Sequence, residues 1–368
     1  MLKHLGQLFF IGISGKALTE DEKKFIVEND IGGICLFSRN LEDPKQIFDL
    51  CQEIQSLKSR QASRMPLFIG IDMEGGRVHR LQPPFTQWPA IKILGDLDSS
   101  SAAFKFGLFM GDELRSVGIN LNFAPCVDVL TNPKNEIIGD RSVSTDPEMV
   151  GKIASGLARG YIKSGILCCA KHYPGHGNTL LDSHLDLPVE DVARDRMEEV
   201  ELPPFKKAIR SRLDFMMTAH IKYSNVDPDW PATLSKIWLK DILRDELRYR
   251  GLIISDDLDM KALADNYDKA DIPVRALQAG CDVLLYCNEP DSPPVAIEAV
   301  TRAIDSKELD SAEIQASIDR VLAVKKKKLM NQEPVSLKEA TTIIGHPDHM
   351  RLASSLRDGE LPEDILAK

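Results

Sequence analysis

Short apolar segments recur along the chain at spacings that fit the strands of a buried parallel sheet. Within most segments the apolar residues are continuous and do not alternate with polar ones, which is typical of strands covered on both faces. The eight segments are residues 8–13, 33–37, 67–71, 120–124, 166–170, 215–219, 252–255 and 282–286. They predict eight strands of ordinary length.

Between these segments the apolar residues recur at three-and-four spacing, which predicts amphipathic helices. The helical stretches are residues 20–29, 43–60, 102–117, 146–164, 198–212 and 235–247. Eight strands alternating with helices describe either a closed (β/α)8 barrel or a long doubly wound sheet. A dinucleotide-binding sheet would carry GxGxxG after its first strand, and the segment from Gly12 to Ala17 does not supply it. We therefore favour the barrel.

The predicted fold is thus α/β, a single (β/α)8 TIM-like barrel over residues 1–330 that carries the chemistry. The remaining residues 331–368 contain Pro334 and a helix-like stretch from Leu337. We expect them to form a C-terminal helical tail that packs on the barrel and frays at its end.

The charge of the chain argues against a nucleic-acid partner. The chain has 368 residues, with 46 Lys and Arg against 56 Asp and Glu, so its formal net charge is −10. A nucleic-acid binder needs a basic stripe, and the longest basic run, from Lys325 to Lys328, is interpreted as the solvated end of a helix. We therefore expect no nucleic-acid partner. We also expect the protein to be a monomer.

The seven cysteines are odd in number and most lie inside apolar runs, so we interpret them as buried thiols in a reducing compartment. The apolar stretch from Leu8 to Ile13 is too short to span a bilayer, and no basic leader or small-residue cleavage site frames it. These features predict a cytoplasmic protein without a membrane partner.

Polar side chains concentrate where the predicted strands end, which is where a barrel places its active site. Asp72 follows the third strand, and a loop with Asp140 and Arg141 follows the fourth. Lys171 and His172 end the fifth strand, His220 the sixth, and Asp256 with Asp257 the seventh. Because these ends meet at one face of a barrel, we expect a single catalytic site there.

The segment from Lys171 to His184 is the most informative one. It holds three of the eight histidines, and Pro174, Gly175 and Gly177 prevent a regular helix through it. Asp182 and His184 lie two residues apart, so the carboxylate could reach an imidazole nitrogen. Such a pair orients the ring and favours its protonated form, as a proton donor requires.

The segment from Leu252 to Met260 brings Asp256 to the mouth of the barrel, with Asp257 and Asp259 behind it. One of these carboxylates is expected to cap the following helix. A carboxylate held at a strand end suits a nucleophile or a base, because the strand fixes its position closely.

Four motifs together resemble those of the single-domain β-N-acetylglucosaminidases of glycoside hydrolase family 3, the NagZ type, across nearly the full chain. They are, as they stand here, Lys171-His-Tyr-Pro-Gly-His-Gly177 followed by Asp182-Ser-His184, Asp72-Met-Glu-Gly-Gly-Arg-Val-His-Arg80, Gly139-Asp-Arg141 and Ser255-Asp-Asp-Leu258. The chain departs from the commonest form of the pattern at four positions, Tyr173, Asn178, Met73 and His79. Those departures concern fine substrate preference.

The resemblance implies that Asp256 is the nucleophile of a retaining exo-acting glycosidase and that His184, assisted by Asp182, is its general acid and base. It also implies that the terminal N-acetylglucosamine (GlcNAc) is bound by Asp72, Arg80, Arg141, Lys171 and His172. No cofactor and no metal would be needed. The substrate would be a GlcNAc-containing disaccharide or muropeptide. The physiological role would be the recycling of bacterial cell-wall fragments. A histidine has an unperturbed pKa near 6.5, which suits a group that gives and regains a proton.

The same residues also fit other classes of enzyme and one class of binding protein. A metal-dependent hydrolase could use His172, His176 and His184, with Asp182 and His220, although Lys171 and Arg141 would crowd a cation. Phosphate could replace water, because a histidine adds no second negative charge, and the enzyme would then be a phosphorylase. An aldolase using Lys171 as a Schiff-base lysine and a sugar-binding barrel without catalysis are two further possibilities.

Overall fold

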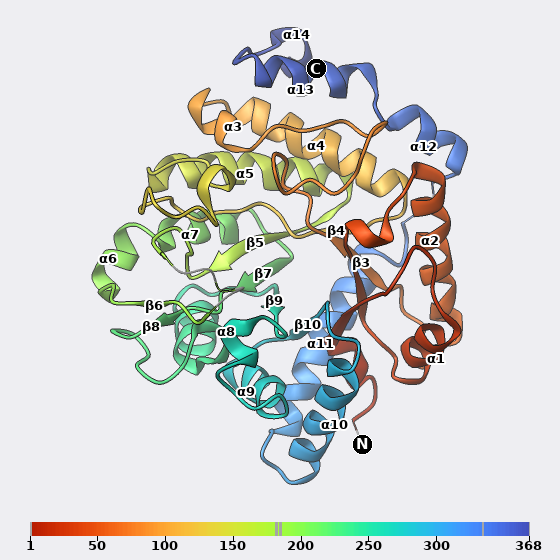
Figure 1. Cartoon of the computed structure of the whole chain (residues 1–368), viewed down its shortest axis with the longest axis vertical. Helices are drawn as coiled ribbons and strands as arrows, with labels where there is room; N and C mark the ends of the chain where they lie inside the picture. Colours follow the sequence, from red (N-terminus) through yellow and green to blue (C-terminus); the bar gives the residue numbers. More distant parts are fainter. Residues whose placement is uncertain (1, 181–182, 184–185, 333–334, 368) are drawn as a thin grey trace.

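The computed structural model describes residues 2–180, 183, 186–332 and 335–367. Parallel strands close into a barrel in the order β1-β10-β9-β7-β5-β4-β3-β2, seen nearly end-on in Figure 1. The barrel strands are β1 Phe9–Gly12, β2 Gly33–Leu36, β3 Phe68–Ile71, β4 Leu121–Asn122, β5 Leu167–Tyr173, β7 Phe215–Thr218, β9 Leu252–Asp257 and β10 Val283–Tyr286. Each overlaps one predicted segment, and the predicted (β/α)8 fold is confirmed.

Helices surround the barrel as an outer ring (Figure 1). They are α1 Glu20–Glu28, α2 Pro44–Ser56, α3 Lys92–Asp96, α4 Ser100–Ser116, α5 Pro147–Ser164, α6 Arg194–Glu199, α7 Leu202–Arg210, η6 Ile237–Glu246, α8 Lys261–Ala264, α9 Asp271–Ala279, α10 Ser292–Asp305 and α11 Ser311–Lys328. Short helical turns are η1 Leu5–Leu8, η2 Ser38–Asn40, η3 Leu57–Ser59, η4 Gly139–Arg141 and η5 Ala232–Leu234. A small second sheet pairs β6 Val189–Glu190 with β8 Lys222–Tyr223.

Aromatic rings fill the barrel interior. The ring centroid of Phe68 lies 5.4 Å from that of Phe10 and 5.3 Å from that of Phe215. Gly33 and Gly70 leave room for them, since an added Cβ would lie 2.6 Å from the Phe10 ring at Gly33 and 2.7 Å from the Phe123 ring at Gly70. Side chains alternate along a strand, so Gly70 and then Asp72 follow Phe68 on the lumen side, toward the carboxyl ends. The aromatic layer thus closes the barrel below the polar face.

The interpretation of Lys325 as part of a solvated helix end is wrong. Its side chain is fully buried near the amino ends of the strands, where Nζ donates to Gln7 Oε1 at 2.6 Å and to Gly32 O at 2.7 Å. The ammonium also lies 4.8 Å from the centroid of the Phe68 ring. Burial lowers the pKa of Lys325 to about 7. The lysine therefore fills the barrel floor.

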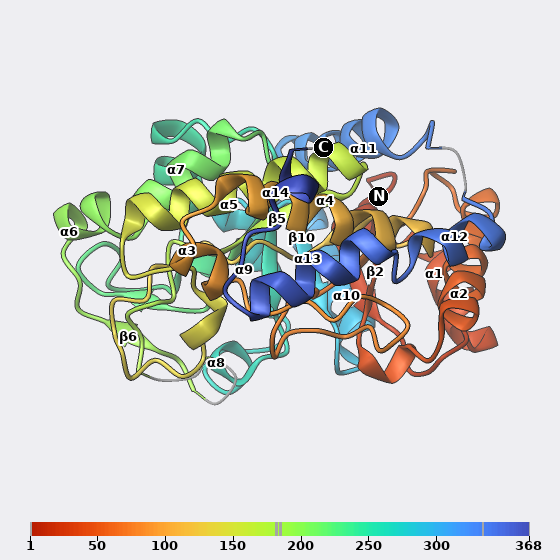
Figure 2. The ribbon, with the colours of Figure 1, turned by 90° about the horizontal axis from the view of Figure 1, so that it is seen from above.

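The C-terminal segment forms three short helices, α12 Leu337–Ile343, α13 Pro347–Arg357 and α14 Glu363–Leu366, each in contact with α4. Figure 2 shows α13 running alongside α4. Glu113 of α4 is 2% exposed and accepts hydrogen bonds from Gly345 N at 3.0 Å and His349 Nδ1 at 3.1 Å. The carboxylate of one barrel helix thereby holds this segment in place.

The described helices include none that is both long and apolar enough to cross a membrane. All seven cysteines are free and buried, as expected. The helix expected at residues 198–212 is divided, because α6 ends at Glu199 and α7 begins at Leu202.

Candidate active site

The polar residues expected to form one site lie at the carboxyl ends of β3, β5 and β9, each of which is separated from the next by one other strand of the barrel. Asp72 follows β3, Lys171 and His172 belong to β5, and Asp256 belongs to β9. Cys169, one lumen layer below Lys171, has its thiol within electrostatic range of Lys171, Asp72 and Asp256. The three strand ends therefore direct charged groups to the same place above Cys169.

Lys171 is the buried centre of a charge network. Its side chain is 2% exposed, and Nζ lies 2.6 Å from Asp72 Oδ1 and 2.6 Å from Glu74 Oε1. Arg141, from η4, donates to both oxygens of Glu74 at 2.9 Å. Two cations thus share two carboxylates, of which Glu74 is buried and Asp72 is partly exposed.

The pKa values in this network follow from burial and pairing. Burial alone would raise the pKa of Glu74, but the charges of Arg141 and Lys171 outweigh it and hold the pKa far below its usual range. Burial likewise works to lower the pKa of Lys171, but Asp72 and Glu74 raise it above the ordinary value. Glu74, Arg141 and Lys171 are therefore charged at neutral pH, and the network offers a ligand fixed hydrogen-bond donors and acceptors.

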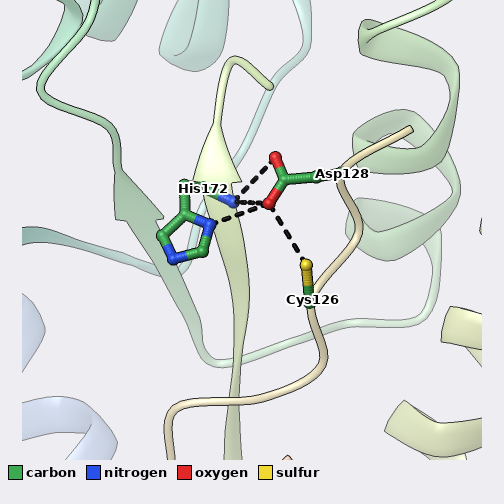
Figure 3. A group of neighbouring side chains, drawn as sticks. All are labelled: Cys126, Asp128 and His172. Carbon is green, nitrogen blue, oxygen red and sulfur yellow. Dashed lines mark hydrogen bonds and ion pairs between the residues drawn. The ribbon is translucent and has the colours of Figure 1, made fainter. Parts of the chain in front are cut away.

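Asp128 is a second centre, and Figure 3 shows how it holds His172. Its Oδ2 lies 2.7 Å from His172 Nδ1 and accepts from Cys126 Sγ at 3.2 Å, while the backbone N–H of His172 and of His176 also donate to the carboxylate. Burial works against ionisation, but the facing histidine lowers the pKa of Asp128 to about 2. The contact fixes the His172 ring and leaves Nε2 3.3 Å from Arg141 Nη2.

His176 is held as a neutral side chain. It is 3% exposed, with Nδ1 2.7 Å from Thr179 Oγ1 and Nε2 3.3 Å from Ser183 Oγ. Burial and the neighbouring His172 lower the pKa of His176 to about 4. It therefore links the start of its loop to Ser183, whose carbonyl accepts from Ala262 N at 3.2 Å in α8.

Asp256 and Asp257 end β9 in different surroundings. Asp256 is partly exposed, and its Oδ1 accepts from Asp257 N at 2.8 Å. Asp257 is 7% exposed and accepts from Asn288 Nδ2 at 2.7 Å and from Cys287 N at 3.2 Å. Burial and then the charge of Asp259 raise the pKa of Asp257 to about 7. Of the two, Asp256 is the carboxylate that a ligand can reach.

The expected helix cap by one of these carboxylates is wrong. No side chain caps α8 at Met260 in the described structure, because Asp257 Oδ1 accepts from Asp259 N instead and the Asp259 side chain bonds to Ser292. Both carboxylates connect the end of β9 to the segment after β10. Their role is to join neighbouring strand ends.

Four other residues singled out from the sequence are Arg80, Asp182, His184 and His220. Arg80 is partly buried, and its Nε has no hydrogen-bond partner among the described residues. Asp182 and His184 lie outside the described residues. His220 is buried, with Nδ1 2.7 Å from Thr233 Oγ1 and Nε2 2.9 Å from Asp257 O.

Comparison with known proteins decides the family. The glycosyl hydrolase family 3 N-terminal domain matches residues 2–324. The chain belongs to glycoside hydrolase family 3. A β-hexosaminidase of Alkalilimnicola ehrlichii is 39% identical over 302 residues, which cover 80% of this chain and 84% of that protein.

Solved structures agree with this assignment. A family 3 β-N-acetylglucosaminidase of Paenibacillus sp. str. FPU-7 superposes with a TM-score of 0.91 at 34% identity, covering 98% of this chain and 69% of that one. NagZ of Neisseria gonorrhoeae gives a TM-score of 0.77 at 32% identity, covering 96% and 98%. The family 3 protein is therefore a glycosidase with β-hexosaminidase function that acts on a small-molecule sugar.

Sequence reasoning missed Glu74 and Asp128 as site residues of this family 3 hydrolase. Glu74 stands two residues after Asp72, inside the motif from Asp72 to Arg80. Asp128 follows the fourth strand, but nothing in the sequence distinguishes it from a helix cap or a loop group. The position of each carboxylate near a strand end was the only sequence signal for a role in the site. The structure adds that the Glu74 side chain is 2% exposed and the Asp128 side chain 0% exposed, so each must pair with a buried partner.

Three side chains lie close enough together to be considered as ligands of one metal ion. In the described part of the chain, ligand atoms of Cys126, Asp128 and His172 lie within 4.8 Å of one another. Both His172 Nδ1 and Cys126 Sγ are already hydrogen-bonded to the same Asp128 oxygen (Figure 3). A cation there would have to replace these contacts, so the arrangement fits a hydrogen-bonded support for His172.

Proposed function

We propose that the protein is a retaining exo-β-N-acetylglucosaminidase that forms a covalent glycosyl-enzyme on Asp256. In the first step a carboxylate oxygen of Asp256 bonds to the anomeric carbon while the bond to the leaving-group oxygen breaks. Water then attacks the same carbon and releases the aspartate. The strand-end position of Asp256 supports this role, because β9 holds the carboxylate beside the charged network of Lys171.

The proton-transfer group in this proposal is His184, oriented by Asp182. It would protonate the leaving oxygen in the first step and remove a proton from water in the second. Support comes from the motif that carries both residues and from Ser183 between them, which is 3% exposed and contacts His176 beside the sugar-binding network.

Asp72, Arg80, Arg141, Lys171 and His172 are proposed to bind the terminal sugar. Two cations and their carboxylates provide fixed donors and acceptors for ring hydroxyls, and the buried Nε of Arg80 is a donor without a partner among the described residues. Glu74 and Asp128 orient these groups from behind.

One observation carries the proposal, namely the convergence of Asp256, Asp72 and Lys171 from three strands above Cys169. It is tested by incubation with a slow 5-fluoro β-GlcNAc glycoside, digestion and mass spectrometry. We expect the added mass on the peptide that contains Asp256, and its absence from Asp256→Ala. Label on another residue would reject Asp256 as the nucleophile.

Phosphorolysis is a second candidate activity, because a histidine in place of the second carboxylate lets phosphate approach. Turnover in phosphate buffer distinguishes the two. Free GlcNAc as the only sugar product supports hydrolysis, and GlcNAc 1-phosphate supports a phosphorylase.

For the physiological setting we propose the recycling of bacterial cell-wall fragments in the cytoplasm, with GlcNAc removed from an anhydro-muropeptide by a monomeric enzyme. The likeness to NagZ over nearly the whole chain supports it. In this proposal residues 1–330 form the catalytic barrel and residues 331–368 support it. Release of GlcNAc from chitin-derived glycosides but never from muropeptide disaccharides would reject this setting.

A further inference from the structure

The end of β9 carries the proposed nucleophile beyond the part of the strand that β7 supports. The two strands are neighbours in the barrel (Figure 1), and in the described structure their last paired residues are Met217 and Ile254. β9 continues to Asp257. The ladder with β7 therefore stops before it reaches Asp256, and other contacts have to hold this end of the strand.

Contacts from β10 and the segment after it hold one side of this strand end. Leu285 N donates to Ser255 Oγ at 3.0 Å. Beyond β10, Asn288 Nδ2 and Cys287 N donate to the carboxylate of Asp257 at 2.7 Å and 3.2 Å. The side that faces β10 is thus held by hydrogen bonds from both backbone and side chains.

On the side that faces β7, a histidine supplies the contact. His220 stands two residues after the end of β7 and is 1% exposed, and its Nε2 lies 2.9 Å from Asp257 O. A carbonyl oxygen can only accept a hydrogen bond, so Nε2 carries the proton that is donated. The imidazole therefore takes the place of a ladder hydrogen bond from β7 at this point.

The ring of His220 is also fixed at its other nitrogen. Nδ1 lies 2.7 Å from Thr233 Oγ1, in η5. Thr233 is fully buried, and its hydroxyl donates to Ala219 O at 3.0 Å and lies 2.8 Å from Thr218 Oγ1. Because both ring nitrogens are engaged, the imidazole cannot turn without the loss of a buried hydrogen bond.

Asp257 transmits this support to the nucleophile. Its backbone N–H donates to Asp256 Oδ1 at 2.8 Å, while its carbonyl oxygen accepts from His220 and its carboxylate accepts from Asn288. The polar groups of Asp257 thus join the Asp256 carboxylate to one contact on the β7 side and one on the β10 side. A shift of the Asp257 backbone would turn its N–H away from Oδ1 and change the direction in which the Asp256 carboxylate points.

From these contacts we propose that His220 is a positioning residue for the nucleophile. It holds the Asp257 backbone from the β7 side, so that Asp256 meets the anomeric carbon in the geometry that displacement requires. This inference rests on the proposed function, because it takes Asp256 as the nucleophile. The role needs no contact with the sugar and no proton transfer, so loss of His220 should slow the attack and leave sugar binding unchanged.

Two variants of His220 differ in which ring nitrogen they replace. In His220→Gln the side-chain amide can reach the position of Nε2 and donate to Asp257 O, whereas in His220→Asn the amide ends near the position of Nδ1. The measured quantity is the rate constant for labelling of Asp256 by the slow 5-fluoro β-GlcNAc glycoside. We expect His220→Asn to lower it about 10- to 100-fold and His220→Gln to stay within about fivefold of the wild-type chain.

Two further measurements separate positioning of the nucleophile from sugar binding and from proton transfer. The inhibition constant of GlcNAc as a competitive inhibitor should change by less than about twofold in His220→Asn, because ground-state binding is retained. The fall in kcat/KM should be equal for dinitrophenyl and methyl β-GlcNAc glycosides, because both need the attack by Asp256, whereas loss of a proton donor affects chiefly poor leaving groups.

The matched control is His349→Asn, the same change at a second buried histidine, which is 6% exposed on α13 and outside the ring of strands. It should keep the wild-type labelling rate even where it lowers the urea midpoint. Thr233→Val removes the support of Nδ1 and keeps the shape of the side chain, so it should lower the labelling rate about three- to tenfold. This variant decides the matter if His220→Asn does not fold.

A wild-type labelling rate in His220→Asn, or in Thr233→Val where the asparagine variant does not fold, would overturn the inference. So would a loss as large in His220→Gln as in His220→Asn, a GlcNAc inhibition that weakens in parallel with the rate, or a loss confined to poor leaving groups. Label on a residue other than Asp256 in the wild-type chain would instead reject the proposed function.

Discussion

Glu74→Gln is the substitution that tests the charge network most directly. The carboxylate is 2% exposed and accepts from Lys171 at 2.6 Å and from Arg141 twice at 2.9 Å. The glutamine keeps the shape of the Glu74 side chain but removes its negative charge, so Lys171 and Arg141 lose one of the carboxylates that neutralise them. Removal of one partner from a buried pair typically costs about 3–5 kcal/mol. Because the amide oxygen can still accept a hydrogen bond, we expect a loss at the lower end, about 3 kcal/mol in the free energy of unfolding at pH 7.

The loss should depend on pH in a definite direction. The folded-state pKa of Glu74 is depressed well below its ordinary value. Its contribution to stability is therefore present above the unfolded pKa, about 4.3, and is lost as the pH falls below that value. The difference between the wild-type protein and Glu74→Gln should be constant from pH 8 to about pH 5.5 and shrink at lower pH.

Urea unfolding of both proteins at several pH values measures this difference. A matched control is Glu148→Gln, which removes a carboxylate paired with Lys207 at the surface, where the Glu148 side chain is 75% exposed. The control should change stability by less than about 1 kcal/mol at every pH. A Glu74→Gln effect as small as the control, or one that stays constant down to pH 3.5, would refute the reasoning.

Three further predictions concern other parts of the molecule. Lys325 has a folded-state pKa of about 7, below its unfolded value of about 10.4, so the unfolded state binds more protons and stability should rise from pH 7 to pH 10. Lys325→Met should abolish that rise in urea midpoints, and an unchanged slope would contradict the assignment. Asp128→Asn should loosen His172 and lower kcat/KM for p-nitrophenyl β-GlcNAc by up to about 100-fold, whereas a change within twofold would speak against a positioning role. His184→Ala should slow glycosides with poor leaving groups by about 10²- to 10⁴-fold and dinitrophenyl glycosides much less, and equal losses on both would remove His184 from the acid role.

The fold was predictable because its signals are local. Most barrel strands are, or begin with, a continuous apolar run, and a parallel strand covered on both faces needs that composition whatever its partner is. The positions of Asp72, Lys171 and Asp256 at strand ends were predictable for the same reason, because the few residues around each one show where its strand stops. Closure of the barrel then brings such ends to one face.

The pairing of charges was decided only by the tertiary structure. Arg141 meets Glu74 across 67 positions of sequence, His172 meets Asp128 across 44, and Lys325 meets Gln7 across 318. Sequence by itself determined the barrel and the residues at its rim, because strand composition and strand ends are short-range properties. Which carboxylate neutralises which cation, and whether a lysine faces solvent or the barrel floor, depends on burial and distance, and those exist only once the chain has closed on itself.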